Sequence, residues 1–151
     1  MKNPFDRLDV AGLGPGHDSA PAVYAHRRLW LLLGWGLLVS VVVLSLIPGV
    51  PVQPGLGLDK LAHCSAYALL MLWFSQLLQR RGWPALAVWL LVLGMGLEWI
   101  QGLTGYRSSS YGDIVANGLG IAIAWALAVS GRATFLAGIE RRLSAHGSPG
   151  P

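Results

Sequence analysis

The sequence predicts an all-α polytopic membrane protein, folded as a bundle of four transmembrane helices. Its 151 residues are 54% hydrophobic and 12% charged, whereas soluble domains contain about 25% charged residues. The apolar residues are concentrated in four stretches close to the ~20 residues that a helix needs to cross a bilayer. Charged and amide side chains gather at alternate ends of these stretches. This pattern is typical of a chain that crosses a membrane repeatedly.

The first predicted span covers about residues 29–47 and contains no charged residue. Arg27 and Arg28 precede it, as in a signal peptide. However, the apolar run is too long for a secretory core, and residues 45–48 lack the small-residue cleavage pattern. An uncleaved helix is therefore expected. The proline-rich residues 48–55 predict a loop, because proline interrupts helices.

The other three spans follow with short connections. The second covers about residues 61–78 and ends at the polar residues 79–82. The third starts at Trp83-Pro84, since proline is tolerated in a first helical turn, and extends to about residue 101. The fourth covers about residues 114–130. Residues 29–130 thus predict one transmembrane domain.

The two ends of the chain differ from this domain. Residues 1–28 are polar and broken by glycine and proline, which predicts a flexible cytoplasmic leader. Residues 131–151 predict a cytoplasmic tail. Within it, apolar residues recur near helical spacing and Glu140 lies among arginines on the opposite face, which indicates a short amphipathic helix on the inner membrane surface. The apolar residues are Phe135, Leu136, Ile139 and Leu143.

The basic residues predict the orientation. Only Lys60 and Arg107 flank the spans on one side. Because basic residues favour the cytoplasmic side, both termini are expected in the cytoplasm of a bacterium, with a multi-pass protein in its inner membrane. The nine basic residues on that side are Lys2, Arg7, Arg27, Arg28, Arg80, Arg81, Arg132, Arg141 and Arg142.

Three short polar motifs should then meet at the outer face. Each contains a pair of polar residues three or four positions apart, which places the pair on one helix face. Ionisable groups near hydrocarbon are costly, so their convergence indicates a functional site. The candidate ligand-binding residues are Asp59, Lys60, His63, Glu98, Gln101, Arg107, Asp113 and Asn117. Tyr67 continues the face of Asp59 and His63.

Each of these residues also has a structural interpretation. Asp59 and Asp113 precede apolar helices and are candidate N-caps, with Ser110 as a competing cap for the fourth span. Lys60 alone would be an interfacial lysine that extends its ammonium toward water, and Arg107 a loop arginine at lipid headgroups. For Glu98 we expect an ion pair with Lys60 or Arg107, with Gln101 supplying amide hydrogen bonds.

Other residues indicate packing. Small residues recur every four positions in the last span and predict close helix contact. They are Ala116, Gly120, Ala124 and Ala128. Aromatic residues near the predicted interfaces resemble an aromatic belt. They are Trp30, Trp83, Trp99, Tyr106 and Tyr111. Cys64 is expected to be a small buried hydrophobe.

Several functional classes are disfavoured. The net charge of +4 is not arranged as a basic stripe with stacking aromatics, so nucleic-acid binding is not expected. The histidine and acid spacings match no specific zinc motif, and we expect neither a metal nor another cofactor. No serine or cysteine has a base at a recognisable spacing. Catalytic residues therefore stay unassigned, and the sequence does not decide whether the protein is an enzyme.

In order along the chain, these motifs resemble the VanZ-like family of small bacterial membrane proteins. The matching residues occur in family order over about residues 45–130. The family is named for a protein associated with resistance to teicoplanin, which acts at the cell envelope. The resemblance implies an envelope-facing role but supplies no reaction. The motifs are Asp59-Lys60-x-x-His63 with Tyr67, Glu98-x-x-Gln101, Gly105-x-Arg107, and Asp113-x-x-x-Asn117 with Gly118 and Gly120.

Three functions follow from these expectations. In the first, the site binds or processes an anionic envelope molecule such as a lipid-linked cell-wall precursor, held by Arg107 and Lys60 and linked to teicoplanin tolerance. In the second, the polar residues lock the helix packing, and the protein assembles with a membrane partner or with copies of itself. In the third, the protein is an enzyme that uses acid–base or metal chemistry, although the ligand spacings match no specific zinc motif. Ligand identity, oligomeric state and antibiotic spectrum are not encoded in these motifs.

Overall fold

The computed structural model describes residues 24, 26–47, 57–104, 110–132 and 134–146. Within them the regular structure is entirely helical: α1 (Arg27–Leu46), α2 (Leu58–Leu77), a short 3-10 turn η1 (Arg80–Gly82), α3 (Trp83–Leu103), α4 (Tyr111–Val129) and α5 (Phe135–His146). Most of the predicted leader, the loop at 48–55 and the end of the tail lie outside the described residues.

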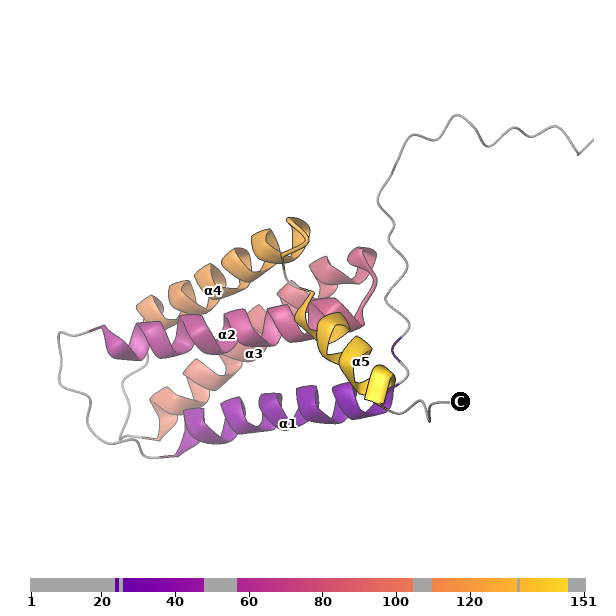
Figure 1. Ribbon diagram of the computed structural model, residues 1–151. Coiled ribbons are helices and arrows are strands. Elements are labelled where there is room, and N and C mark those ends of the chain that lie inside the picture. Colours follow the sequence, from indigo (N-terminus) through magenta and orange to yellow (C-terminus); the bar gives the residue numbers. More distant parts are fainter. Residues whose placement is uncertain (1–23, 25, 48–56, 105–109, 133, 147–151) are drawn as a thin grey trace, which may run out of the picture.

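Successive helices from α1 to α4 run in opposite directions (Figure 1). The C-terminal ends of α1 and α3 and the N-terminal ends of α2 and α4 therefore meet at one end of the bundle, which we call the polar end. The opposite end, where α5 packs beside the start of α1, is the α5 end. The alternation inferred from the sequence is present in the fold.

Three helical segments are long and apolar enough to cross a membrane: Arg27–Leu46, Arg80–Leu103 and Tyr111–Val129. They indicate a membrane protein. The segment α2 falls outside this set although it has 20 residues. It begins with Leu58-Asp59-Lys60 and also contains His63 and Gln76, which lower its hydropathy.

The helix pair α2 and α4 forms the most extensive contact in the bundle. Ala116, Gly120, Ala124 and Ala128 are all buried, so the predicted small-residue face is a packing face. A Cβ atom at Gly120 would lie 2.1 Å from the carbonyl oxygen of Cys64. Since backbone cannot yield as a side chain can, this contact requires glycine.

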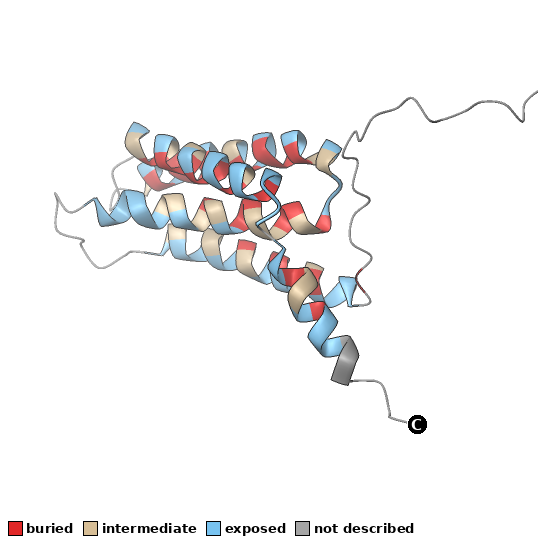
Figure 2. Cartoon of the chain, turned by 45° about the horizontal axis from the view of Figure 1, so that its top comes forward, coloured by how far each residue is buried: buried red, intermediate tan, exposed pale blue. Residues whose placement is uncertain are grey.

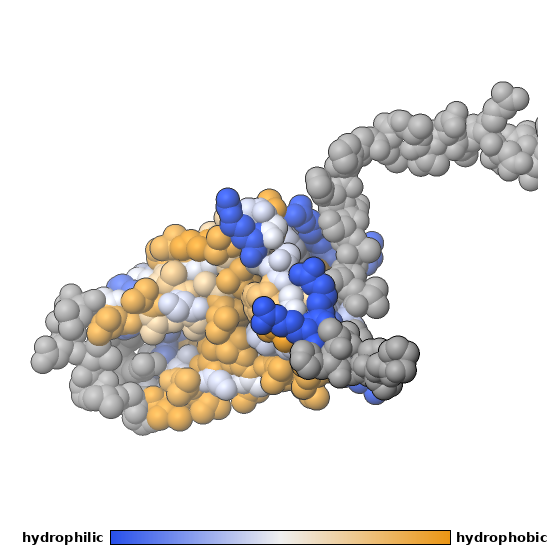
Figure 3. Space-filling model, in the orientation of Figure 1, coloured by the Kyte–Doolittle hydropathy of each residue, from blue (hydrophilic) through white to orange (hydrophobic). Residues whose placement is uncertain are grey.

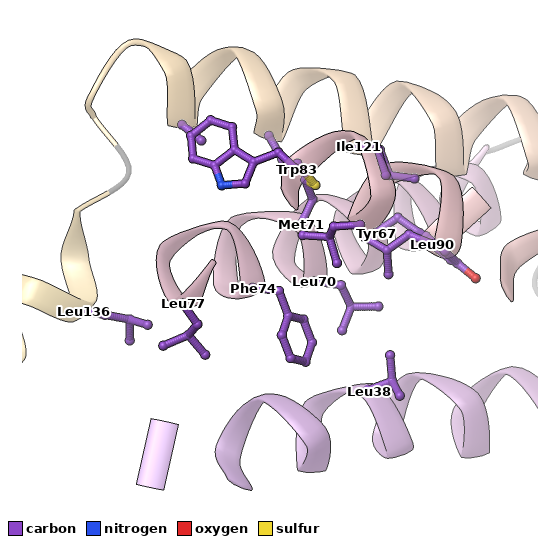
Figure 4. Close-up of a cluster of buried hydrophobic side chains, with 14 of the residues drawn as sticks. Leu38, Tyr67, Leu70, Met71, Phe74, Leu77, Trp83, Leu90, Ile121 and Leu136 are labelled. Carbon is purple, nitrogen blue, oxygen red and sulfur yellow. The ribbon is translucent and has the colours of Figure 1, made fainter. Parts of the chain in front are cut away.

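The apolar core lies between the helices and extends toward α5. Leu70, Met71 and Leu90 are completely buried, and Phe74 faces α1 across the core (Figure 4). Buried residues form stripes along the inward faces of α2, α3 and α4 (Figure 2). These stripes follow from the helical spacing of large apolar residues on α2 and α3 and of small ones on α4.

On the face of the bundle that Figure 3 shows, the surface is largely apolar, and hydrophilic residues gather at the α5 end. Leu32, Leu44, Trp99 and Val115 are each about 70% exposed. Such a large apolar surface suits lipid contact rather than water.

The predicted aromatic belt is found only in part. Trp99 and Tyr111 are exposed at the polar end, but Trp30 and Trp83 are buried. Trp83 donates its indole N–H to the carbonyl oxygen of Ser75 at 3.0 Å. At the α5 end the tryptophans therefore join helices together.

The helix α5 exists as predicted, but its contact face is different. Leu136 is completely buried and Glu140 is 8% exposed, whereas Ile139 and Leu143 are more than 40% exposed. The assignment of Glu140 to the solvent face was wrong. Its carboxylate accepts hydrogen bonds from the indole N–H of Trp30 in α1 and from the backbone N–H of His26, the residue before α1. Ile139 and Leu143 stay available to a membrane surface.

Candidate functional site

The polar end brings together polar residues from three helices. Asp59, Lys60 and His63 come from α2, Glu98 and Gln101 from α3, and Asp113 and Asn117 from α4. Glu98, Gln101, Asp113 and Asn117 are buried. Arg107 lies outside the described residues, so its relation to the cluster stays a prediction.

A contact between His63 and Asn117 joins α2 to α4. The ring Nδ1 of His63 lies 3.2 Å from the amide oxygen of Asn117. An amide oxygen only accepts hydrogen bonds, so Nδ1 carries the proton and donates it. The other ring nitrogen, Nε2, lies 3.9 Å from Oδ2 of Asp113. The pairs inferred from i,i+4 spacing thus face each other across the helix contact.

Lys60 is held by two carboxylates. Its ammonium lies 3.0 Å from Asp59 and 3.3 Å from Oδ1 of Asp113. Gly112 permits this arrangement, because a Cβ there would lie 2.7 Å from the Lys60 side chain. Lys60 is nevertheless half exposed, so its pairing with Asp59 is open to competition from solvent or a ligand.

The interpretation of the two aspartates as N-caps was wrong. Gly57 is the N-cap of α2, and Asp59 lies within the first turn. Ser110 caps α4 by accepting a hydrogen bond from the amide of Gly112 at 3.1 Å. Asp113 is therefore not required as a cap, and its carboxylate faces Lys60 and His63.

Glu98 is 2% exposed, and one of its two carboxylate oxygens accepts a hydrogen bond from the described residues. Its Oε1 accepts the backbone N–H of Ser110 at 2.5 Å. Among the described residues, its Oε2 is buried without a hydrogen-bond partner. We expected an ion pair with Lys60 or Arg107. The pair with Lys60 is not formed, because Lys60 is turned toward the two aspartates, and Arg107 lies outside the described residues. A buried acceptor left in this state is costly and calls for a proton, a cation or a ligand.

Gln101 has a different role from the one expected. Its amide nitrogen donates to the carbonyl oxygen of Ser45 at 2.6 Å. This bond fastens the end of α3 to the end of α1, where helical carbonyls lack partners. Gln101 therefore supports the bundle instead of the carboxylate of Glu98.

Tyr67 forms the inner boundary of the cluster. It is 2% exposed, and its hydroxyl has no hydrogen-bond partner in the part of the chain that the structure describes. The hydroxyl points away from the α5 end that Leu136 marks (Figure 4). A Cβ at Gly94 would lie 3.0 Å from this hydroxyl and 2.7 Å from Nδ2 of Asn117. Gly94 thus makes room for both polar groups.

A pocket of about 210 Å³ reaches the cluster between α1 and α2. Its walls combine aliphatic carbon with two polar groups of the cluster. It is lined by Val41, Leu44, Ser45, Ala62, His63, Ala66 and Tyr67. An amphiphilic molecule matches such walls better than a purely polar solute does.

The described site is acidic. Asp59, Glu98 and Asp113 supply three carboxyl groups against the single ammonium of Lys60. His63, Glu98 and Asp113 each offer one ligand atom, and these three atoms lie within 4.8 Å of one another. They are the described residues best placed to hold a cation.

Two contacts were missed from the sequence. One is the hydrogen bond from the backbone N–H of Ser110 to Glu98. A pattern of side chains in the sequence does not predict a backbone donor. The other is at the α5 end, where Glu140 bonds His26 and Trp30 more than 100 positions away. The helical spacing of Leu136 and Glu140 could have indicated their shared face, but not the partner.

No family model, no curated protein and no solved structure matches this chain. The resemblance to the VanZ-like family therefore rests on the motifs themselves. In the described residues, the charged and amide members of those motifs lie in the half of α2, α3 or α4 nearest the polar end, while Tyr67 and Gly120 lie near the middle of α2 and α4.

Proposed function

We propose that the protein is a VanZ-like multi-pass protein of the bacterial cytoplasmic membrane, in which α1 to α4 all cross the bilayer. Twenty residues of α2 extend about 30 Å, the thickness of the hydrocarbon core. The helix α2 contacts α1, α3 and α4. These neighbours shield its polar residues from lipid, so α2 can cross the bilayer with a lower hydropathy than a helix that lipid surrounds. The arginine distribution supports cytoplasmic termini and an outward-facing polar end.

The polar end binds the headgroup of an amphiphilic envelope molecule. The observation that carries this proposal is the pocket between α1 and α2, whose aliphatic walls lead to His63 and Tyr67. An acyl or prenyl chain fits the aliphatic part, and a polar headgroup fits the cluster beside it. Glu98 Oε2 and the Tyr67 hydroxyl have no hydrogen-bond partner among the described residues and can bond to a headgroup.

The proposed headgroup is anionic, such as that of a lipid-linked cell-wall precursor. Arg107 and Lys60 are the residues assigned to it, since guanidinium and ammonium groups bind phosphate or carboxylate. Lys60 can exchange its exposed bond to Asp59 for such a ligand. Teicoplanin tolerance would follow if the bound molecule belongs to the pathway on which the antibiotic acts.

The test is to purify the protein in native lipid and identify the species that co-purify. Lys60→Ala and Arg107→Ala should deplete an anionic amphiphile, while Arg132→Ala, at an exposed arginine of the other end, should retain it. Glycopeptide susceptibility at equal expression gives a second readout. Unchanged bound species and unchanged susceptibility in both variants would refute the proposal.

The pocket has its own test. Ala66→Leu narrows the space between α1 and α2, whereas Ala126→Leu adds the same carbon atoms at an exposed position of α4. Loss of the bound amphiphile in the first variant alone would support entry through the pocket. Equal retention in both would contradict it.

A helix lock is the second candidate function of the polar residues. The bond from Gln101 to Ser45 favours it for that residue. It does not explain Glu98, whose second oxygen is buried and contacts no donor. We therefore assign the lock to Gln101 and ligand binding to the cluster around His63.

A further inference from the structure

We propose that His63, Glu98 and Asp113 form a binding site for a divalent transition-metal cation of the zinc class. Imidazole nitrogen and carboxylate oxygen both bind such ions, and three protein ligands leave a fourth position for water or substrate. The candidate ligand atoms come from α2, α3 and α4 and lie within 4.8 Å of one another. The proposal departs from the expectation of no metal, which rested on sequence spacing alone.

The second and independent observation is the unpartnered oxygen of Glu98. The residue is 98% buried, and its Oε2 meets no donor among the described residues. A buried carboxylate is usually paired with a cation or hydrogen-bonded through both oxygens. Lys60 is not its partner, because the ammonium is held by Asp59 and Asp113. Arg107, the other expected partner, lies outside the described residues. A metal ion at this oxygen would supply a positive charge.

The contacts of His63 point to the same conclusion. Its Nδ1 is engaged by the amide oxygen of Asn117, which leaves Nε2 as the ring nitrogen available to a metal ion. Nε2 faces Oδ2 of Asp113 at 3.9 Å. A cation between these two atoms would bind both.

Each proposed ligand side chain also makes a polar contact with another residue of the protein. Asn117 contacts Nδ1 of His63, Lys60 donates to Oδ1 of Asp113, and the Ser110 amide donates to Oε1 of Glu98. Such outer contacts orient ligands in metal sites. Each of the three side chains has a second nitrogen or oxygen atom that these contacts do not use.

The distances are compatible with small side-chain adjustments. Ligand bonds of about 2.0–2.2 Å place the ligand atoms of a tetrahedral zinc roughly 3.4 Å apart. The 3.9 Å separation of His63 and Asp113 and the 4.8 Å limit for the set require contractions of roughly 0.5–1.4 Å. Side-chain rotations suffice for this change.

The metal site stands on this geometry and does not rest on headgroup binding. It would nevertheless explain how an acidic cluster accepts an anion, since a divalent ion neutralises the carboxylates and offers its fourth position to an oxygen. Either proposal can fail without the other. Zinc binding is measurable without any lipid.

The experiment uses the full-length protein in detergent, stripped with a chelator and titrated with Zn²⁺ alone, and in parallel with Co²⁺. Wild-type protein should bind about one ion per chain and give the visible absorption of Co²⁺ in a low-symmetry site. His63→Gln, Glu98→Gln and Asp113→Asn should lose this binding. Glu140→Gln, which changes a buried acid at the α5 end, should retain it.

Asn117→Ala tests the orienting contact. Loss of such a partner should weaken zinc affinity about 10–100-fold without abolishing binding. Gel filtration and helical circular dichroism identify variants that do not fold. Folded wild-type protein that binds no stoichiometric Zn²⁺ would overturn the proposal, and that result depends on no variant. Equal zinc binding by folded Glu98→Gln would overturn it as well.

Discussion

Two buried glutamates at opposite ends of the bundle differ in how completely they are bonded. At the α5 end, Oε1 of Glu140 accepts from the backbone and ring of His26 at 3.0 Å, and Oε2 accepts from Trp30 at 2.6 Å. At the polar end, Glu98 accepts one backbone N–H, and its Oε2 has no partner among the described residues. Both side chains are less than a tenth exposed.

The difference separates a structural contact from a binding site. Glu140 has a donor for each oxygen, so it fastens α5 to α1 and needs nothing further. Glu98 is retained at a cost, because its second oxygen has lost water without gaining a donor. Incomplete bonding of a buried acid is therefore the feature that marks the polar end as functional.

The largest expected effect comes from separating α2 and α4 at the polar end. Gly120→Ala places a Cβ within 2.1 Å of the Cys64 carbonyl oxygen, and overpacking of this kind costs about 1–3 kcal/mol or more. The contact between His63 and Asn117 should be lost, while α5 stays docked. Hydrogen exchange of α2 and α5 measures both effects. Gly118→Ala, whose Cβ would lie at 3.6 Å from Leu91, is the control.

A somewhat smaller effect is expected from Glu140→Gln. The side-chain N–H₂ of the new glutamine must then face a donor group of His26 or Trp30. The hydrogen bond from that donor is lost, and two donor groups face each other. Exchange of α5 amides should accelerate roughly tenfold or more, while the polar end is unchanged. Unaltered α5 protection would show that Leu136 alone holds this helix.

The docking of α5 should also respond to acid. Burial raises the pKa of Glu140, but the hydrogen bonds from Trp30 and His26 outweigh burial and hold that pKa below its ordinary value. The stabilisation is therefore complete above the ordinary glutamate value of about 4.3 and is lost as pH falls through the lower folded value. Hydrogen exchange of α5 between pH 7 and 3 measures this. Glu140→Gln should lack the acid-dependent step.

A small effect is expected from Gln101→Ala. The variant loses the bond to Ser45, and single hydrogen bonds between membrane helices average about 0.6 kcal/mol. Reversible unfolding in mixed micelles measures the change. Zinc affinity should be nearly unchanged, since Gln101 contacts none of the three proposed ligands. A large loss of zinc binding would instead make Gln101 part of the site.

Much of the fold follows from the sequence because membrane helices are governed by length and hydropathy. The helices α1 to α4 begin and end within about three residues of the predicted spans. The small-residue face of α4 was predictable from four-residue spacing. The helix α2 was predicted as a span and forms as a helix, but it is not among the three described segments that are long and apolar enough to cross a membrane.

The members of the site were predictable, but their pairing was not. Helical spacing places His63 with Asp59 and Asn117 with Asp113, yet partner choice depends on how the helices rotate against one another. Lys60 therefore pairs with Asp113 instead of Glu98. The donor to Glu98 is the backbone of Ser110, and residue type carries no information about such a donor.

The most direct test of whether Glu98 serves binding and Glu140 serves structure is to measure the stability of two isosteric variants in metal-free buffer. Glu98→Gln keeps an oxygen for the Ser110 amide and places an N–H₂ where Oε2 has no partner, so its unfolding free energy should equal or exceed that of the wild type. Glu140→Gln should be less stable than the wild type. If Glu98→Gln proves as destabilised as Glu140→Gln, then Glu98 is a structural lock, and the account of the polar end as a binding site is contradicted.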